Sequence, residues 1–259
     1  LLRVLRVPRA MLPEVLPAAH AFGMVPAAVF GEPLIIGGVA GEQQAGMFGQ
    51  GCHAPGMAKN TYATGCFMLL HTGDKPIVSS RGLVATCCAQ LRDKEYALEG
   101  SVFIAGAVVQ WLRDQLGFFS SSGEVEKLAS SVLDSDGVFV VPAFTGLGAP
   151  HWDPDARGAI LGLTLGAGRA HIVRAALEAV ANQTFELQRA FAGDGVRWSS
   201  LRIDGGMSAN GFLAQDLADL LALEVERPAN METTALGAGM PAGIGTGLFA
   251  SLEEAASAV

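Results

Sequence analysis

Hydrophobic residues recur at helical spacing in two stretches of the chain, 101–116 and 170–191. The apolar face of the first consists of positions 104, 108, 111, 112 and 116, and that of the second of 173, 177, 180 and 187, with Thr184 on the same face. Residues three and four apart lie on one face of an α-helix, so this spacing predicts two amphipathic helices. Shorter helices are predicted at 42–49, 210–221 and 234–242.

Short apolar runs that end at glycine, proline or another turn residue predict the strands. These runs are 34–39, 59–64, 66–71, 83–88, 95–98, 138–141, 160–163, 201–203 and 224–226. The first 30 residues contain four prolines and little periodicity, and we expect an extended connector there. Strands joined by turns come first and strands alternating with helices follow, which predicts an α/β domain with a mixed sheet.

Composition indicates a folded chain with a large core and narrows the choice of partners. Half of the 259 residues are hydrophobic, and 33 are glycine, about twice the usual share. The formal net charge of −8 argues against nucleic acid, which binds basic surfaces. The longest uncharged stretch, 233–252, contains five glycines and a proline, so we predict no membrane-spanning segment.

The cysteines and the two ends of the chain add two further expectations. None of the four cysteines forms a Cys-x-x-Cys pair, and no signal peptide is recognisable at the start. This pattern favours a reducing cytoplasm and argues against a disulfide framework or a zinc site. The chain opens at Leu1 without a methionine and stops in a helix-like stretch, so we expect it to be part of a longer protein.

The turn predicted between the strands 59–64 and 66–71 is a first candidate for chemistry. Gly65 lets the backbone approach an anion closely, and the Thr64 hydroxyl can donate a hydrogen bond to a phosphate oxygen. The same residues also suit a plain hairpin turn. The dipeptide Gly-Lys never occurs in the chain, which excludes a P-loop.

Two further candidates lie where a strand passes into a helix. Asp204-Gly205-Gly206 follows the strand 201–203, and Asn210 begins the next helix, an arrangement that can seat a nucleotide or form an ordinary turn. Glu42 follows the strand 34–39 at a helix start, where α/β proteins place catalytic groups and where a carboxylate also complements the helix dipole. Polar Gln43 and Gln44 beside Glu42 favour a site.

Several collinear blocks of this sequence resemble the C-terminal part of the FGGY carbohydrate kinase family. The blocks are MLPEV (11–15), GEQQ (41–44), MAKNTYATGCFMLLHTG (57–73), YALEGSVFIAGAVVQWLRD (96–114), VPAFTGLGAPHWDPDARG (141–158), DGGMSAN (204–210) and TALGAG (234–239). The resemblance implies an actin-like ATPase (ribonuclease H-like) fold, with a mixed sheet flanked by helices. It also implies ATP or ADP and Mg²⁺ as cofactors, with glycerol as the substrate.

The resemblance assigns roles by position to eight residues. It places Thr64 near the transferring phosphate, Gly106 and Gln110 at nucleotide contacts, and Gly206 and Asn210 at the adenosine. On the substrate side, Gln43 matches a residue that contacts glycerol, and Phe67 an aromatic beside its carbon chain. Glu42 matches the catalytic base, which takes the proton of the attacking hydroxyl. No metal ligand is assigned.

Two positions depart from the family. The family has aspartate where this chain has Glu42, and the extra methylene moves the carboxylate by roughly 1 Å, a scale that can cost about 100-fold in rate. Pro241 stands where the family has ordinary helix formers, and we expect it to kink the helix 234–242.

These observations predict two parts of the chain and the reaction of the intact protein. Residues 1–50 are expected to form the end of an N-terminal domain and a hinge region with the base, and 51–259 a nucleotide-binding domain truncated at its end. The N-terminal Asp-x-Gly-Thr segment of the family does not occur here, so we expect the isolated chain to be inactive. The intact protein is expected to phosphorylate glycerol as a homo-oligomer. The alternatives are another FGGY sugar or polyol kinase and a catalytically impaired nucleotide-binding module.

Overall fold

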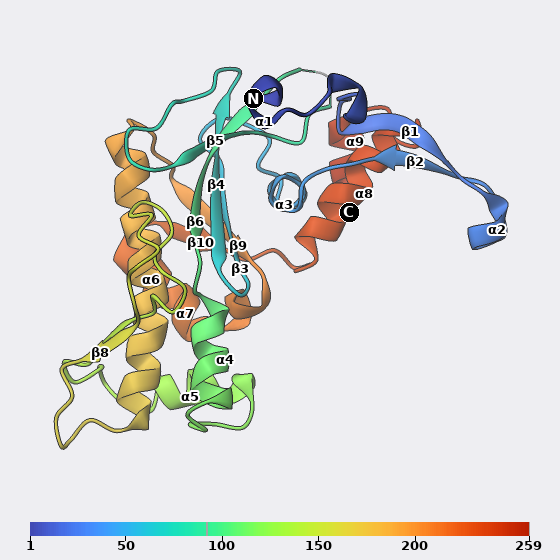
Figure 1. Ribbon diagram of the computed structural model, residues 1–259. Coiled ribbons are helices and arrows are strands. Elements are labelled where there is room, and N and C mark those ends of the chain that lie inside the picture. Colours follow the sequence, from blue (N-terminus) through green and yellow to red (C-terminus); the bar gives the residue numbers. More distant parts are fainter. Residues whose placement is uncertain (92, 259) are drawn as a thin grey trace.

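A six-stranded mixed sheet forms the centre of the computed structural model, which describes residues 1–91 and 93–258 (Figure 1). Its strands are β10 (Glu224–Glu226), β9 (Ser200–Asp204), β3 (Ala58–Tyr62), β4 (Cys66–Gly73), β6 (Tyr96–Val102) and β5 (Val84–Cys87), in that spatial order. The strands β10, β9 and β3 run parallel, and β4, β6 and β5 continue the sheet in antiparallel pairs. The mixed sheet predicted from the sequence is therefore confirmed.

Helices cover both faces of this sheet. On one face lie α6 (Arg169–Gly193) and α7 (Gly211–Leu221), with α4 (Gly106–Asp114) and the short α5 (Val125–Ala129) packed beside them. On the other face lie α3 (Glu42–Gly49) and α8 (Thr233–Gly245), and α9 (Leu252–Ser257) packs against α8. Because side chains alternate along β3, Tyr62 reaches α6 while Lys59 reaches α3.

The two faces differ in how they are filled. The main hydrophobic core lies between the sheet and α6, α7 and α4, and it includes Leu98, Leu177 and Ile203. On the opposite face, α3 and α8 approach so closely that their backbones touch. A Cβ on Gly237 of α8 would overlap the carbonyl of Ala45, and one on Gly49 of α3 would overlap the carbonyl of Thr233. This pair of helices therefore depends on its glycines.

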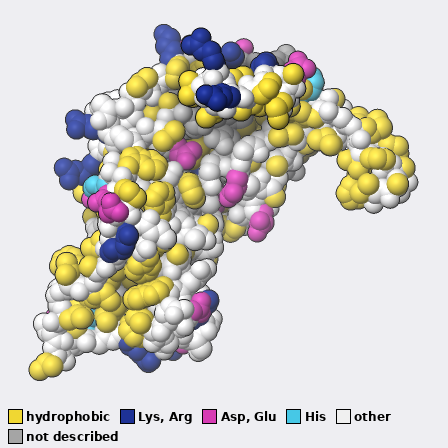
Figure 2. All heavy atoms as spheres, in the orientation of Figure 1, with side chains coloured by type: hydrophobic (Ala, Val, Ile, Leu, Met, Phe, Trp, Pro, Cys, Tyr) yellow, Lys and Arg dark blue, Asp and Glu magenta, His cyan; other side chains and the backbone are white. Residues whose placement is uncertain are grey.

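An arm formed by β1 (Ala19–Val25), α2 (Ala27–Phe30) and β2 (Leu34–Gly38) projects from the α8 side of the molecule (Figure 1). The expectation of an extended connector over the first 30 residues is wrong, because β1 pairs with β2 and α1 (Leu2–Leu5) precedes it. Both strands are largely exposed and show no regular alternation of buried and exposed residues, which is the pattern that would indicate a strand from the sequence. Figure 2 shows hydrophobic side chains gathered along the arm, with Met24, Phe30 and Ile35 at least half exposed.

Several predicted boundaries move because tertiary pairing overrides local spacing. The helix expected from 101 begins at Gly106, since Ser101 and Val102 pair with Phe67 and Cys66 as the last residues of β6. The strand expected to end at Thr64 ends at Tyr62, which leaves Thr64 in the turn. Pro241 lies inside α8, which runs through it as one helix and extends beyond the predicted 234–242.

The remaining strands, β7 (Phe139–Val141) and β8 (Ala159–Leu161), form a small antiparallel sheet of their own. The helices predicted at 42–49, 170–191 and 210–221 are confirmed, with ends that differ by at most two residues. Within residues 1–91 and 93–258, no helix combines the length and the apolar character needed to cross a membrane.

Candidate functional site

A cavity of about 550 Å³ opens where the β3–β4 turn meets the start of α4 and the segment before α7. All five residues predicted to contact a nucleotide line it: Thr64, Gly106, Gln110, Gly206 and Asn210. They come from three separate stretches of sequence, so the fold brings together what the sequence only indicated piece by piece. The volume lies within the usual range for a cofactor or small-molecule site.

The Thr64 turn is held against α4 by backbone hydrogen bonds. The amides of Ala105 and Ala107 donate to the Thr64 carbonyl at 2.8 and 3.0 Å, and the Gly106 amide donates to the Ala63 carbonyl at 2.8 Å. Position 106 requires glycine, because a Cβ there would lie 2.5 Å from the Ala63 carbonyl oxygen. The turn carbonyls thus use the free amides at the start of α4 and leave the Thr64 side chain exposed.

The two glycines after β9 have different functions. Gly205 has a φ of +82°, and a side chain there would also collide with the Tyr62 carbonyl, so only glycine suits this position. A Cβ on Gly206 would meet no atom within 4 Å, and Gly206 lines the cavity. Asn210 caps α7, since its Oδ1 accepts a hydrogen bond from the Leu213 amide at 3.0 Å. At Gly206 the cavity wall is therefore backbone alone, with no side chain projecting from it.

The residues predicted on the substrate side lie across the sheet, at the start of α3 and on β4. Glu42 is exposed at the first position of α3. The side-chain nitrogen of Gln43, Nε2, lies 3.4 Å from Glu42 Oε1. Phe67 is half-buried on β4, opposite Thr61 of β3. Gln44 turns away from this group and donates to Thr86 Oγ1 at 3.0 Å. None of the predicted substrate residues lines the 550 Å³ cavity.

The sequence patterns did not point to Lys59, which lies beneath this group. Its side chain is 0% exposed, and its ammonium donates to Gln43 Oε1 at 2.6 Å and to Thr61 Oγ1 at 2.8 Å. Burial lowers the pKa of Lys59 to about 8, although Asp204 and other acidic groups oppose this effect. The sequence feature that could have indicated Lys59 is its charge within strand β3, whose residues are mostly buried. A folded chain tolerates a buried charge only where polar partners surround it.

Asp204 connects the end of β9 to the α3–α8 pair. It is buried, and its Oδ2 accepts hydrogen bonds from Gln50 Nε2 at 2.8 Å and from Thr233 Oγ1. Gln50 follows the last residue of α3, and Thr233 begins α8. Asp204, which directly precedes Gly205 and Gly206, therefore ties the nucleotide side of the sheet to the helix that carries Glu42.

The buried charge of Lys59 predicts a pH dependence of stability. Below pH 8 the lysine is protonated in the folded and the unfolded chain, whereas between pH 8 and its ordinary pKa of 10.5 only the unfolded chain holds the proton. The unfolded state binds more protons in that window, so the free energy of unfolding rises with pH. Lys59→Met removes this contribution. Denaturant unfolding at pH 7.5 and 9.5 should show wild type gaining about 2 kcal/mol relative to the variant.

The comparison between the two proteins is needed because other groups titrate in the same range. Burial raises the pKa of the Cys52 thiol to about 11, which opposes the lysine as the pH rises. Because the Lys59 charge itself lowers the pKa of this thiol, both proteins carry Cys52→Ala in this comparison. An equal difference between the two proteins at the two pH values would show that Lys59 keeps its ordinary pKa.

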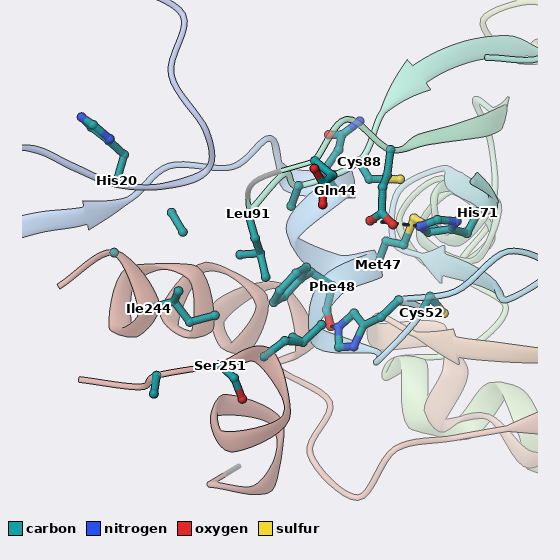
Figure 3. Close-up of a pocket in the computed structure, with 18 of the residues that line it drawn as sticks. His20, Gln44, Met47, Phe48, Cys52, His71, Cys88, Leu91, Ile244 and Ser251 are labelled. Atoms are coloured by element: carbon teal, nitrogen blue, oxygen red, sulfur yellow. Dashed lines mark hydrogen bonds and ion pairs between the residues drawn. The ribbon is translucent and has the colours of Figure 1, made fainter. Parts of the chain in front are cut away.

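A larger cavity, of about 690 Å³, lies between α3, α8, α9 and the start of β1 (Figure 3). Its walls include Phe48 and Ile244 as well as His71, which is 1% exposed. His71 Nδ1 accepts from the Gly73 amide at 3.1 Å, and Nε2 lies 3.4 Å from a carboxylate oxygen of Glu95. Gln44 lines this cavity, but none of the eight residues with an assigned role does, so the smaller one remains the candidate nucleotide site.

Comparison with known proteins agrees with this geometry. Residues 58–246, which include the whole sheet, match the FGGY family of carbohydrate kinases, C-terminal domain. The chain belongs to the FGGY family of carbohydrate kinases. This FGGY chain is 57% identical over 260 aligned residues to the glycerol kinase of Acidovorax ebreus (strain TPSY), covering 98% of the chain and 52% of that relative. It thus spans about half the length of the curated relatives it matches.

Solved structures place the FGGY chain in the predicted fold class. A crystal structure of Plasmodium falciparum glycerol kinase with ADP superposes with a TM-score of 0.89 at 34% identity, over 99% of this chain and 52% of that one. Xylulose kinase from Rhodospirillum rubrum gives a TM-score of 0.82 at 24% identity, over 99% of this chain and 53% of that one, which shows the fold alone. The mixed sheet flanked by helices agrees with an actin-like, ribonuclease H-like ATPase fold.

Proposed function

We propose that this chain is the nucleotide-binding part of a kinase that transfers the γ-phosphate of ATP to glycerol. The observation that carries the proposal is the 550 Å³ cavity, in which the five residues matched to nucleotide contacts meet. The relatives named glycerol kinase, and the Plasmodium falciparum glycerol kinase crystallised with ADP, support the same assignment. The half that this chain does not span would supply the other side of the active site.

Each predicted residue has a task in this reaction. Gly206 and Asn210 bind the adenosine, Gly106 and Gln110 contact the nucleotide, and Thr64 lies nearest the transferring phosphate. Across the sheet, Gln43 and Phe67 contact glycerol. Glu42 accepts the proton of the attacking hydroxyl, and its exposed position at the start of α3 leaves it accessible to a ligand. Most of the catalysis in phosphoryl transfer comes from such positioning and from charge stabilisation.

Mg²⁺ accompanies the phosphates in this class of reaction, where one or two carboxylates usually hold it together with the phosphates. In the described part of the chain, no group of three or more carboxylate, histidine or cysteine side chains is arranged to hold a metal ion. Glu126, a carboxylate residue of the cavity lining, is exposed and accepts a hydrogen bond from the Gly211 amide at 3.1 Å. We therefore assign no magnesium ligand to these residues and no step to the metal.

Gly206→Val tests the nucleotide site directly on this chain. The new side chain meets no protein atom at its Cβ and projects into the cavity, so it should narrow the site without disturbing the fold. ADP affinity, measured by calorimetry, is expected to fall at least tenfold while the unfolding midpoint stays within experimental error. Gly239→Ala, on the exposed side of α8, is the control that should leave ADP binding unchanged.

The test of the substrate assignment uses the intact kinase, which is this half joined to the N-terminal half that its relatives have. ADP release should be rapid with glycerol and slow with a pentulose such as xylulose, and the isolated chain should be inactive with both. Activity with the pentulose but not with glycerol would replace the assignment by another FGGY sugar kinase. Nucleotide binding without any turnover would favour a catalytically impaired module. The observation behind this alternative is that Glu42 stands where the family has aspartate.

Three further expectations are proposals: a domain boundary, a cellular compartment and an oligomeric state. We place the boundary between the end of an N-terminal domain and the nucleotide domain near residue 50, between α3 and β3. The four cysteines are free, which suits a reducing cytoplasm. The intact kinase is proposed to be a homo-oligomer, which light scattering of the purified protein would test.

A further inference from the structure

The ammonium of Lys59 occupies an unusual position beneath the first turn of α3. It is held by two neutral oxygens, Gln43 Oε1 at 2.6 Å and Thr61 Oγ1 at 2.8 Å. Among the ion pairs of residues 1–91 and 93–258, none includes Lys59. Burying a cation without an ion pair is costly, and a neutral side chain of similar length would avoid that cost. The position therefore indicates a task beyond packing.

The shape of α3 makes room for this ammonium. Gly46 lies one turn after Gln43, and a Cβ on it would come within 3.6 Å of Lys59 Nζ and 3.3 Å of Thr234 Oγ1. A longer side chain at position 46 would take the space through which the lysine reaches Gln43. The helix therefore carries an acceptor for the lysine and, one turn later, the gap that admits it.

The lysine decides how the Gln43 amide is oriented. A primary amide has nearly the same shape after a 180° flip, which exchanges its acceptor oxygen and its donor nitrogen. A protonated lysine only donates, so the oxygen of Gln43 must face Lys59. The NH₂ group then faces the other way, and its nitrogen lies 3.4 Å from Glu42 Oε1 at the exposed start of the helix.

We propose that Lys59 is a positioning residue that holds the Gln43 amide as a hydrogen-bond donor toward the polyol beside Glu42. This inference rests on the proposed function, because it names how the same site selects its substrate. A hydroxyl oxygen can accept from Gln43 Nε2 while its own hydrogen points to the Glu42 carboxylate. A keto oxygen has no hydrogen for Glu42, and an ammonium group cannot accept from the amide. The pair therefore selects a hydroxyl at the position of attack.

The amide orientation can be tested on this chain without any assumption about the substrate. In ¹⁵N-labelled protein the Gln43 side chain should give one pair of NH₂ signals, with slow exchange between the two hydrogens. Lys59→Met leaves both orientations open, so the pair is expected to shift and broaden. Thr61→Val removes only the other acceptor of the lysine and should leave the Gln43 signals in place. Unchanged Gln43 signals in Lys59→Met would overturn the inference.

The consequence for the substrate is tested in the intact kinase. Lys59→Met is expected to raise KM for glycerol about tenfold, the effect of losing one oriented hydrogen bond, with KM for ATP within twofold of wild type. Gln43→Glu keeps an acceptor for Lys59 but removes the donor, and it should raise KM for glycerol at least as much. Thermal unfolding of both variants confirms that they are folded.

The two proposals fail in different ways. If wild type phosphorylates glycerol and Lys59→Met keeps the same KM for it, the positioning inference is wrong and the proposed function stands. If wild type ignores glycerol although Lys59 holds the Gln43 amide in one orientation, the proposed function is wrong, and the polyol part of the inference fails with it.

Discussion

Replacing Gly237 by alanine is expected to lower the free energy of unfolding by about 3 kcal/mol, the upper range for overpacking a close contact. The new Cβ would overlap the backbone carbonyl of Ala45 and lie 2.7 Å from the amide nitrogen of Gly49. Both atoms belong to the backbone of α3, so the strain cannot be relieved by a side-chain rotation. The helices α3 and α8 must separate, and the first turn of α3, with Glu42 and Gln43, must move with them.

The matched control lies two residues further along the same helix. Gly239 is exposed, and a Cβ on it would meet no atom within 4 Å. Gly239→Ala should therefore raise the free energy of unfolding by up to about 1 kcal/mol, because alanine is the better helix former. Chemical denaturation of the three proteins gives the comparison. Equal midpoints for the two alanine variants would show that the α3–α8 contact is looser than the structure describes.

Glu42→Gln is expected to lower kcat of the intact kinase by about 10²- to 10⁴-fold, the usual contribution of a general base. The amide keeps the size of the side chain and removes its ability to take a proton. Glu42 does not line the 550 Å³ cavity, so ADP affinity measured by calorimetry should stay within twofold of wild type. The rate is measured as ADP release at saturating ATP and glycerol.

Glu42→Asp is the control for this experiment, since it keeps the carboxylate and restores the length found in the family. Its turnover is expected to equal or exceed that of wild type, because a shorter side chain removes the misplacement of roughly 1 Å. If Glu42→Gln turns over as fast as wild type, the base is another residue. If all three proteins bind ADP and none transfers phosphate, the impaired-module alternative is supported.

Much of the nucleotide side was predictable because its signals are local. Gly205 and Gly206 follow a strand and precede a helix in the sequence itself, and the structure shows the same order. The Thr64 turn was likewise visible from residues 60–66, although β3 ends two residues earlier than predicted. The roles of these residues came from the family resemblance and stay predictions, whereas their meeting in one cavity is an observation.

The sequence by itself determined the elements whose side-chain periodicity repeats over many residues, such as the helix of 25 residues in α6. It could not determine features that depend on partners far along the chain. Residues 101–102 extend β6 because they pair with Phe67 and Cys66 of β4. The contacts of Lys59 with Gln43 and of Asp204 with Gln50 span 16 and 154 positions. Such contacts arise only when the sheet and α3 pack together, so the tertiary structure alone decided which way the amide beside Glu42 faces.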